Sequence, residues 1–365
     1  MNIGMITFHT PINYGAVLQA YALQQVYQKM GHNAEIIDYC TPKLEGNYKT
    51  IEFPRTLKSW LIFPLQVAHL GDKKRKTCKF IDFRKNNLVL TRRYSCTDDL
   101  VNNPPEYDVY STGSDQVFNV RRPVDEKKVF FLGFTTQKKI SYAASLGKSN
   151  ISEQDVKEIG DYLCDFSWIS IREQYGCDIV NKALSEKKAY KVVDPVFLIT
   201  RKQWQSLGTQ YRRKKIPAKY ILLFALKRIK ESYRYADQLS KNLGLPVVCI
   251  TNHDVVHLKC RNVIIRDAGP TEFLYLMNGA ECIITDSFHG VAFSIIMEKI
   301  FVLSDITDSN ERALELLGML QIRSRCYLQE LKDPIPEQID YSQVNQRLEL
   351  AVNYSREYLE LALAK

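Results

Sequence analysis

Two groups that can transfer a proton lie three residues apart in one polar stretch, Thr285-Asp-Ser-Phe-His-Gly290. The stretch follows the apolar run 282–284, and apolar residues return at helical spacing from Val291. A buried parallel strand, a polar turn and a helix form the place where open α/β sheets bind ligands. His289 is the first candidate for a general acid or base, because an imidazole can change its protonation state near neutral pH. Asp286 is a weaker candidate for the base.

The same turn also offers a site for an anion. The first backbone N–H groups of the expected helix, near Gly290 to Phe293, have no carbonyl partner inside the helix and would face the ligand. Ser287 and Gly290 are therefore predicted to bind a phosphate or carboxylate group of the substrate. The alternative is that His289 has a purely structural place in a connecting turn.

Polar residues also follow three other expected strands. An arginine at the carboxyl end of a strand can hold a carboxylate or phosphate through two parallel hydrogen bonds. A carboxylate in such a place can act as a base or bind sugar hydroxyls. The structural alternatives are ordinary turns and, for the arginine, a salt bridge with an acid. The candidates are Asn13 and Gly15, then Gly113, Ser114 and Asp115, and finally Arg172 and Glu173.

The elements that must position these residues indicate two α/β units. Residues 3–8 are expected to form a strand, 16–29 a helix and 34–39 a strand, which is a Rossmann-type unit without the G-x-G-x-x-G fingerprint. Residues 130–134 form a short apolar run and are also expected to form a strand. The alternation of expected strands and helices starts again near Lys219. We therefore predict an α/β fold in which two Rossmann-like domains face a cleft.

The chain of 365 residues is long for a single hydrophobic core, so two domains are expected. The first domain is predicted to span residues 1–200 and to include an irregular segment, 45–90. The second is predicted to span residues 201–335. Residues 336–365 are predicted to form an amphipathic helix that packs across the domain junction.

Composition argues against several classes of protein. The chain is 45% hydrophobic and 25% charged, and its net charge of +9 suits anionic ligands as well as nucleic acid. No nucleic-acid motif is present, so no nucleic-acid partner is expected. The nine cysteines are scattered without a C-x-x-C pair, which argues against a disulfide framework and a zinc site. The sequence shows no signal peptide and no apolar run of roughly 20 residues, so we expect a cytoplasmic protein.

One stretch suggests contact with a membrane surface. Residues 60–65 are apolar and aromatic, and the basic run Lys73-Lys-Arg-Lys76 follows them. An apolar segment flanked by cations is typical of a membrane interface, so we predict peripheral contact with the cytoplasmic face of the inner membrane. The alternative is a core segment followed by the solvated, basic start of a helix.

Six motifs together resemble the polysaccharide pyruvyl transferase family. Each motif alone is weak, but they occur in order over about residues 3–320, and the ordered set is specific. The motifs are Thr7-Phe-His-Thr-Pro-Ile-Asn-Tyr-Gly-Ala-Val-Leu-Gln-Ala-Tyr-Ala-Leu-Gln24, Gly113-Ser-Asp-Gln-Val-Phe118, Ser141-Tyr-Ala-Ala-Ser145, Ile169-Ser-Ile-Arg-Glu173, Val193-Asp-Pro195 and Thr285-Asp-Ser-Phe-His-Gly290.

The resemblance implies a GT-B-like arrangement, with the first domain on the acceptor side and the second on the donor side. It implies an enzyme that transfers the pyruvyl group of phosphoenolpyruvate to two hydroxyls of a sugar, forming a cyclic ketal and releasing phosphate. The implied acceptor is a lipid-linked galactose or mannose unit of a bacterial capsule or exopolysaccharide precursor. Phosphoenolpyruvate is then a co-substrate, and neither a cofactor nor a metal ion is expected.

The resemblance transfers only where residues match. Some family members have Arg-Leu-His where this chain has Ser287-Phe-His289, so the histidine transfers and the arginine does not. Another cation must then hold the charge of the donor, and the candidates are Arg172 and Arg312. A helix is expected to begin at Ser309 or Asn310, and Asn310 is a further candidate for substrate binding.

Two other classes of function share parts of this pattern. A GT-B nucleotide-sugar glycosyltransferase would share the two domains and the positive helix end, but it would bind a nucleoside diphosphate. A sugar- or phosphate-binding protein without catalytic activity would bind its ligand without turnover. Binding of phosphoenolpyruvate followed by turnover distinguishes the first interpretation from both.

Overall fold

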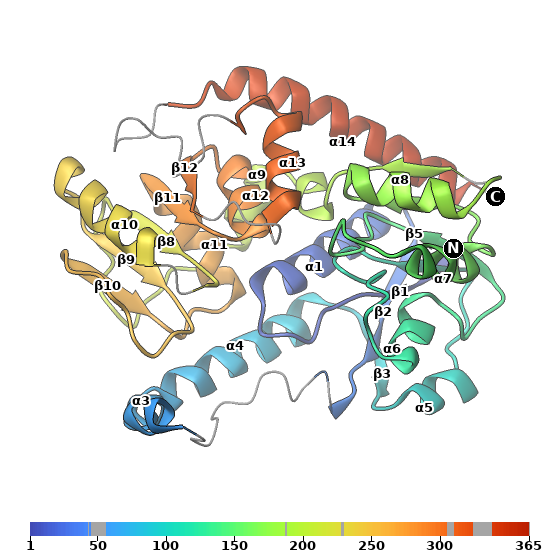
Figure 1. Ribbon diagram of the computed structural model, residues 1–365, viewed down its shortest axis with the longest axis horizontal. Helices are drawn as coiled ribbons and strands as arrows, with labels where there is room; N and C mark the ends of the chain where they lie inside the picture. Colours follow the sequence, from blue (N-terminus) through green and yellow to red (C-terminus); the bar gives the residue numbers. More distant parts are fainter. Residues whose placement is uncertain are drawn as a thin grey trace. The chain divides into compact units, whose positions relative to one another are not determined.

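The chain divides into two compact units. The computed structural model describes residues 1–42, 44, 56–186, 188–227, 230–304, 310–323 and 338–364. The first unit comprises Met1–Tyr48, Arg84–Ile199 and Leu348–Lys365, and the second comprises Lys49–Phe83 and Thr200–Arg347. Each unit contains a parallel sheet with helices packed against it, as Figure 1 shows.

The first unit is built on a five-stranded parallel sheet with the order β3-β2-β1-β4-β5. A short pair of strands, β6 and β7, continues from β5 through isolated bridges. The strands are β1 (Asn2–Ile6), β2 (Asn33–Tyr39), β3 (Leu90–Tyr94), β4 (Val109–Thr112), β5 (Lys138–Ser141), β6 (Ile169–Ile171) and β7 (Ala189–Lys191). The helices are α1 (Tyr14–Lys29), α5 (Thr97–Asn102), α6 (Val124–Phe130), α7 (Glu153–Leu163), α8 (Gln174–Ala183) and the short η1 (Pro195–Leu198).

The second unit repeats this topology, with the strand order β10-β9-β8-β11-β12, again all parallel. Its strands are β8 (Ile221–Phe224), β9 (Val247–Ile250), β10 (Asn262–Ile265), β11 (Cys282–Thr285) and β12 (Ile300–Leu303). Its helices are α3 (Leu57–Ala68), α9 (Arg201–Leu207), α10 (Lys230–Leu243), α11 (Pro270–Gly279), α12 (Phe288–Ile296) and α13 (Glu311–Met319). Helices α4 (Leu70–Asn87) and α14 (Tyr341–Leu363) each begin in the second unit and end in the first.

Both sheets have the strand order of a Rossmann fold. In each, the order reverses next to the first strand, between β1 and β4 and between β8 and β11. Ligands of open α/β sheets bind at the carboxyl ends of the strands at this reversal. The predicted polar turns follow β1, β4 and β11, so the topology places them at the reversal points of their own sheets.

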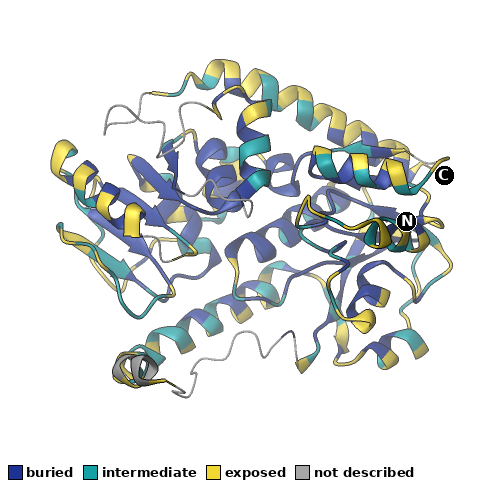
Figure 2. Ribbon diagram, in the orientation of Figure 1, coloured by how far each residue is buried: buried dark blue, intermediate teal, exposed yellow. Residues whose placement is uncertain are grey.

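The central strands are apolar because helices cover both faces of each sheet. Every residue of β4, β8 and β11 is buried, which explains the continuous apolar run of β8 and the apolar run 282–284 of β11. Every residue of α12 is buried as well, and Figure 2 shows the central strands β8 and β11 and this helix in the colour of buried residues. The turn between β11 and α12 is thus held between two buried elements.

Two expectations about local structure need correction. Residues 130–134 do not form a strand: α6 ends at Phe130, and the chain turns through Leu132, which has a φ of 57°. The irregular segment predicted at 45–90 contains α3 and α4 and ends at the first residue of β3, and the compact units place Lys49–Phe83 in the second unit rather than the first. Residues 45–55 of that segment lie outside the described part of the chain.

A search of the described residues for a helix that could cross a bilayer finds none of sufficient length and apolar character.

Candidate active site

The predicted site residues fall into two groups, one in each unit. In the second unit, Asp286 directly follows β11, and its carboxylate binds the turn after β8. One oxygen accepts the N–H of Leu226 at 2.6 Å and the other accepts the N–H of Lys227 at 2.7 Å. His253 lies beside this turn, with Nε2 3.1 Å from the carbonyl oxygen of Leu226. Because both of its oxygens accept backbone N–H groups, Asp286 has the geometry of a residue that positions the turn rather than of a base.

Helix α12 is capped by its own serine. Ser287 accepts the N–H of Gly290 on its hydroxyl at 3.4 Å and the N–H of Val291 on its carbonyl at 2.9 Å. The hydroxyl of Thr285 in turn accepts the N–H of Ser287 at 3.1 Å. The N–H groups of Gly290 and Val291 therefore have partners in Ser287, and ligand binding at this end of the helix stays a prediction. A serine at the N-cap already uses them.

Gly290 has a packing role that leads to a stability prediction. A Cβ at this position would lie 2.1 Å from Oγ1 of Thr285, so only glycine lets α12 approach β11 this closely. We expect Gly290→Ala to lower the free energy of unfolding by about 1–3 kcal/mol, the usual cost of overpacking a filled core. Urea unfolding measures this change.

The matched control is Gly318→Ala in α13. A Cβ there meets no atom within 4 Å, and alanine favours the helix, so the free energy of unfolding should rise by up to about 1 kcal/mol. A Gly290→Ala protein as stable as the wild type would contradict the close contact between α12 and β11.

His289 lies in the first turn of α12 and is 9% exposed. Its ring meets the ring of Phe288 edge-on, with the ring centres 5.1 Å apart. The guanidinium of Arg312 lies 5.9 Å from the centre of the same Phe288 ring. Asn310 is the N-cap residue of α13 and is 5% exposed, without a capping hydrogen bond from its side chain. Ser309, the other predicted cap, lies outside the described residues.

An imidazole, an aromatic ring and a cation therefore lie together at the carboxyl end of β11. His289 is buried, and the guanidinium of Arg312 from α13 reaches the Phe288 ring next to it. Of the two arginines predicted to hold the charge of the donor, Arg312 lies in this group and Arg172 in the other unit.

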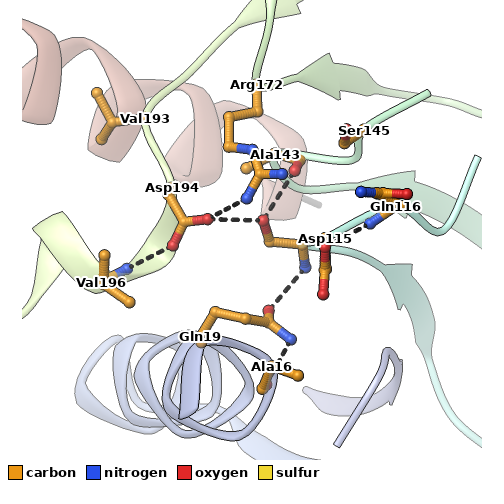
Figure 3. Close-up of polar contacts among 12 residues, drawn as sticks. Ala16, Gln19, Asp115, Gln116, Ala143, Ser145, Arg172, Val193, Asp194 and Val196 are labelled. Atoms are coloured by element: carbon orange, nitrogen blue, oxygen red, sulfur yellow. Dashed lines mark hydrogen bonds and ion pairs between the residues drawn. The ribbon is translucent and has the colours of Figure 1, made fainter. Parts of the chain in front are cut away.

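In the first unit, the turn after β4 is held by buried polar contacts (Figure 3). Ser114 donates its N–H to the side chain of Gln19 at 3.1 Å. Its hydroxyl lies 2.9 Å from the carbonyl oxygen of Ala143 and 3.3 Å from the carboxylate of Asp194. Asp115 and Ala143 have φ angles of 69° and 48°, which are costly for residues other than glycine and persist only where neighbouring contacts impose them.

Arg172 forms a buried ion pair beside this turn. Its Nη1 donates to Asp194 and its Nε donates to Glu173 at 3.1 Å, and the side chain is 3% exposed. Burial alone would lower the pKa of Arg172, but Glu173, Asp194 and Asp115 together raise it above its ordinary value. One guanidinium between two carboxylates leaves an excess of negative charge, which does not attract a phosphate. The geometry therefore matches the structural alternative, a salt bridge in which Glu173 is a partner.

The remaining candidates of the first unit form caps and turns at strand ends. Asn13 is the N-cap of α1, and its side-chain oxygen accepts the N–H of Gly15 at 2.9 Å. The side chain of Asp115 accepts the N–H of the following residue at 2.9 Å. Gly113 has a φ of 114°, and a Cβ there would lie 2.2 Å from the carbonyl oxygen of Tyr142. Ligand contacts of these residues stay predictions.

The structure also brings in polar residues that the sequence analysis missed. Gln19 donates to the hydroxyl of Thr7 at 2.8 Å while it accepts from the turn after β4, and Asp194 joins that turn to the buried arginine. His9 lies between the carbonyl of Thr7 at 3.1 Å and the carboxylate of Asp38 at 2.9 Å. Burial acts to raise the pKa of Asp38, but the hydrogen bond and charge of His9 lower it below its usual value. The sequence held a signal for Gln19 alone. A glutamine within the apolar pattern of a helix is expected to be buried, and a buried amide must form hydrogen bonds.

Comparison with known protein families decides the classification. The model of the polysaccharide pyruvyl transferase family matches residues 13–305. The chain belongs to this family. As a polysaccharide pyruvyl transferase by family, it is a transferase that acts on polysaccharide, and the matched range includes the turns after β4 and β11. No curated protein matches the chain.

The chain also aligns with several solved structures. An α-glucosyltransferase in complex with UDP and DNA aligns with 99% of this chain and 95% of its own, at 8% identity and a TM-score of 0.51. UDP-GlcNAc 2-epimerase from Methanocaldococcus jannaschii aligns with 97% of this chain and 93% of its own, at 14% identity and a TM-score of 0.49. The epimerase from Neisseria meningitidis aligns with 100% and 95%, at 12% identity and a TM-score of 0.48. The first likeness concerns the fold alone, which is an α/β fold of two Rossmann-like domains of the GT-B type.

Proposed function

We propose that the protein transfers the pyruvyl group of phosphoenolpyruvate to two hydroxyls of a sugar. The observation that supports this most directly is His289, a buried imidazole in the first turn of α12, with Arg312 on the ring of the adjacent Phe288, in a chain of this family. The product is a cyclic ketal, and one phosphate is released for each pyruvyl group. The acceptor in this proposal is a lipid-linked galactose or mannose of a surface polysaccharide precursor, and the location is the cytoplasm.

The reaction requires one proton donor and one proton acceptor. Protonation of the methylene carbon of phosphoenolpyruvate leaves a positive centre on the next carbon, and a sugar hydroxyl adds there and loses its proton. Phosphate leaves, and a second hydroxyl of the same sugar closes the ring and gives up its proton. In the proposal His289 supplies the first proton and receives one from the incoming hydroxyls, since a single imidazole can do both near neutral pH. The departing phosphate takes up the other hydroxyl proton.

The donor also requires a positive charge, because phosphoenolpyruvate carries a carboxylate and a phosphate. We assign this role to Arg312 rather than Arg172. Arg312 lies over the ring next to His289, whereas Arg172 is already bound to two carboxylates in the other unit. A guanidinium is suited to this task because it holds carboxylate and phosphate groups with paired hydrogen bonds.

A thermal-shift measurement with phosphoenolpyruvate and with UDP-sugars tests the choice of donor. At about 100 times its dissociation constant a ligand stabilises the folded protein by about 2.7 kcal/mol, so phosphoenolpyruvate should raise the Tm by several degrees and UDP-sugars should not. Arg312→Gln should lose this shift. The matched control is Arg201→Gln, which removes a half-exposed arginine paired with Glu298 in the same unit and should keep the shift.

A shift with UDP-sugars and none with phosphoenolpyruvate would instead support a nucleotide-sugar glycosyltransferase. Within the described residues, no group of three or more histidine, cysteine, aspartate or glutamate side chains is placed to hold a metal ion. Metal-independent chemistry stays part of the proposal, and an assay in EDTA checks it.

A further inference from the structure

Helix α3 exposes several large apolar side chains within eight residues. Trp60 is 63% exposed, Leu65 42% and Val67 45%. Single exposed apolar residues are common on protein surfaces, but a contiguous group of them marks an interaction surface. At about 100° per residue around α3, the order is Val67, Trp60, Pro64, Ala68 and Leu65, and all five are exposed. We call Trp60, Leu65 and Val67 the α3 apolar face.

Helix α4 and His69, which precedes it, are held to the rest of the second unit by ion pairs. The α3 apolar face, by contrast, is exposed. His69 lies 3.2 Å from Asp254, and Lys73 lies 3.5 Å from the same carboxylate. Further along α4, Arg75 contacts Asp267 at 3.0 Å, and Lys79 contacts Glu272 at 2.7 Å. All of these ion pairs lie within the second unit.

These contacts change the interpretation of the basic run at 73–76. Lys76 is 5% exposed, its Nζ lies 2.7 Å from the side-chain oxygen of Asn252, and burial lowers the pKa of Lys76 to about 7. With Lys73 and Arg75 in ion pairs, Lys74 is the exposed member of the run. The run is therefore neither a cationic patch for lipid nor a solvated helix start, and residues 60–65 are not a core segment because Trp60 and Leu65 are exposed.

The composition of the segment points to lipid rather than protein as the partner. No acidic residue occurs between Phe53 and Gly71, and the whole chain carries a net charge of +9, which suits an anionic surface. Tryptophan is enriched at membrane interfaces. At 12 residues, α3 is shorter than the roughly 20 residues that a helix needs to cross a bilayer, so it would lie along the membrane surface.

We propose that α3 lies in the headgroup region of an anionic lipid bilayer, with Trp60, Leu65 and Val67 entering the boundary of its apolar layer. This placement follows from exposure and composition and does not depend on which reaction the protein catalyses. An amphipathic helix of this kind binds by its buried apolar area together with electrostatic attraction to anionic lipids. The proposal therefore predicts binding that needs both the α3 apolar face and anionic lipid.

Vesicle flotation with the full chain tests the proposal. The wild type should float with phosphatidylcholine vesicles that contain phosphatidylglycerol, and much less with phosphatidylcholine alone. The triple variant Trp60→Gln, Leu65→Gln, Val67→Gln should lose binding at least tenfold. The matched control replaces three exposed apolar residues of the first unit, Val124→Gln, Leu350→Gln and Leu361→Gln, and should bind as the wild type does.

A second measurement locates the contact. Brominated lipids should quench the fluorescence of the wild type more than that of Trp60→Phe, although Trp60→Phe should still float. Circular dichroism and Tm confirm that the variants are folded.

Three results would overturn the proposal: no flotation of the wild type, equal flotation of the triple variant and the wild type, or loss of self-association in the triple variant without any binding to vesicles. The last result would mean that a second copy of the chain covers the α3 apolar face.

Discussion

Replacement of His289 by alanine is expected to lower the turnover number by roughly 10²–10⁴, the usual contribution of a general acid–base group. The side chain is 9% exposed in the first turn of α12, and the proposed reaction needs one group that both gives and takes a proton. The variant would keep Arg312, which the proposal assigns to binding of the donor, so the loss should appear in kcat rather than in KM. Steady-state kinetics with phosphoenolpyruvate and a sugar acceptor measure both constants.

Two further variants separate chemistry from structure at this position. His289→Gln keeps a polar side chain of similar size but cannot change its charge, so it should be as inactive as His289→Ala. His69→Ala removes a histidine that pairs with Asp254 in the same unit and should keep normal turnover. Normal turnover in His289→Gln would remove His289 from the proton transfers.

Replacement of Asp194 by alanine should lower the free energy of unfolding by about 3–5 kcal/mol, the usual cost of removing one partner of a buried ion pair. Both side chains of the pair are almost fully buried, at 3% exposure for Arg172 and 0% for Asp194. The guanidinium would keep Glu173 but lose its contact with the carboxylate that also binds Ser114. Guanidinium chloride unfolding followed by circular dichroism measures the change.

The control for this prediction is an ion pair on the surface. Asp99→Ala breaks the pair with Arg92, in which the side chains are 32% and 54% exposed, so solvent already screens the charges. We expect no measurable shift of its unfolding midpoint. If Asp194→Ala unfolded at the same denaturant concentration as the wild type, the buried pair would contribute nothing to stability.

The sequence could predict those parts of the fold in which local pattern and environment agree. Residues 282–284 form a short apolar run before a polar turn, and the structure has β11 at Cys282–Thr285 followed by α12. The same reasoning failed at residues 130–134, because a short apolar run does not distinguish a strand from the buried end of a helix. Asp125 and Glu126 lie in the first turn of α6, where negative side chains stabilise a helix, and they were the local signal that a helix begins there.

The candidate site shows a similar division. The position of His289 after a buried strand could be predicted, because strand, turn and helix are adjacent in the chain. The contacts of Asp286 with Leu226 and Lys227 could not, because about 60 residues separate them. The pairing of Arg172 with Asp194 depends in the same way on a contact across 22 residues. Periodicity within a short segment carries no information about such partners.

The most direct test of the proposed reaction is mass spectrometry of the acceptor together with an assay of released phosphate. The purified protein would be incubated with phosphoenolpyruvate and a panel of lipid-linked and aryl-linked galactosides and mannosides. The account predicts that one acceptor gains the mass of one pyruvic acid less one water, with one phosphate released per acceptor. Transfer of a sugar from a nucleotide sugar to the same acceptors, with no phosphate released from phosphoenolpyruvate, would contradict it.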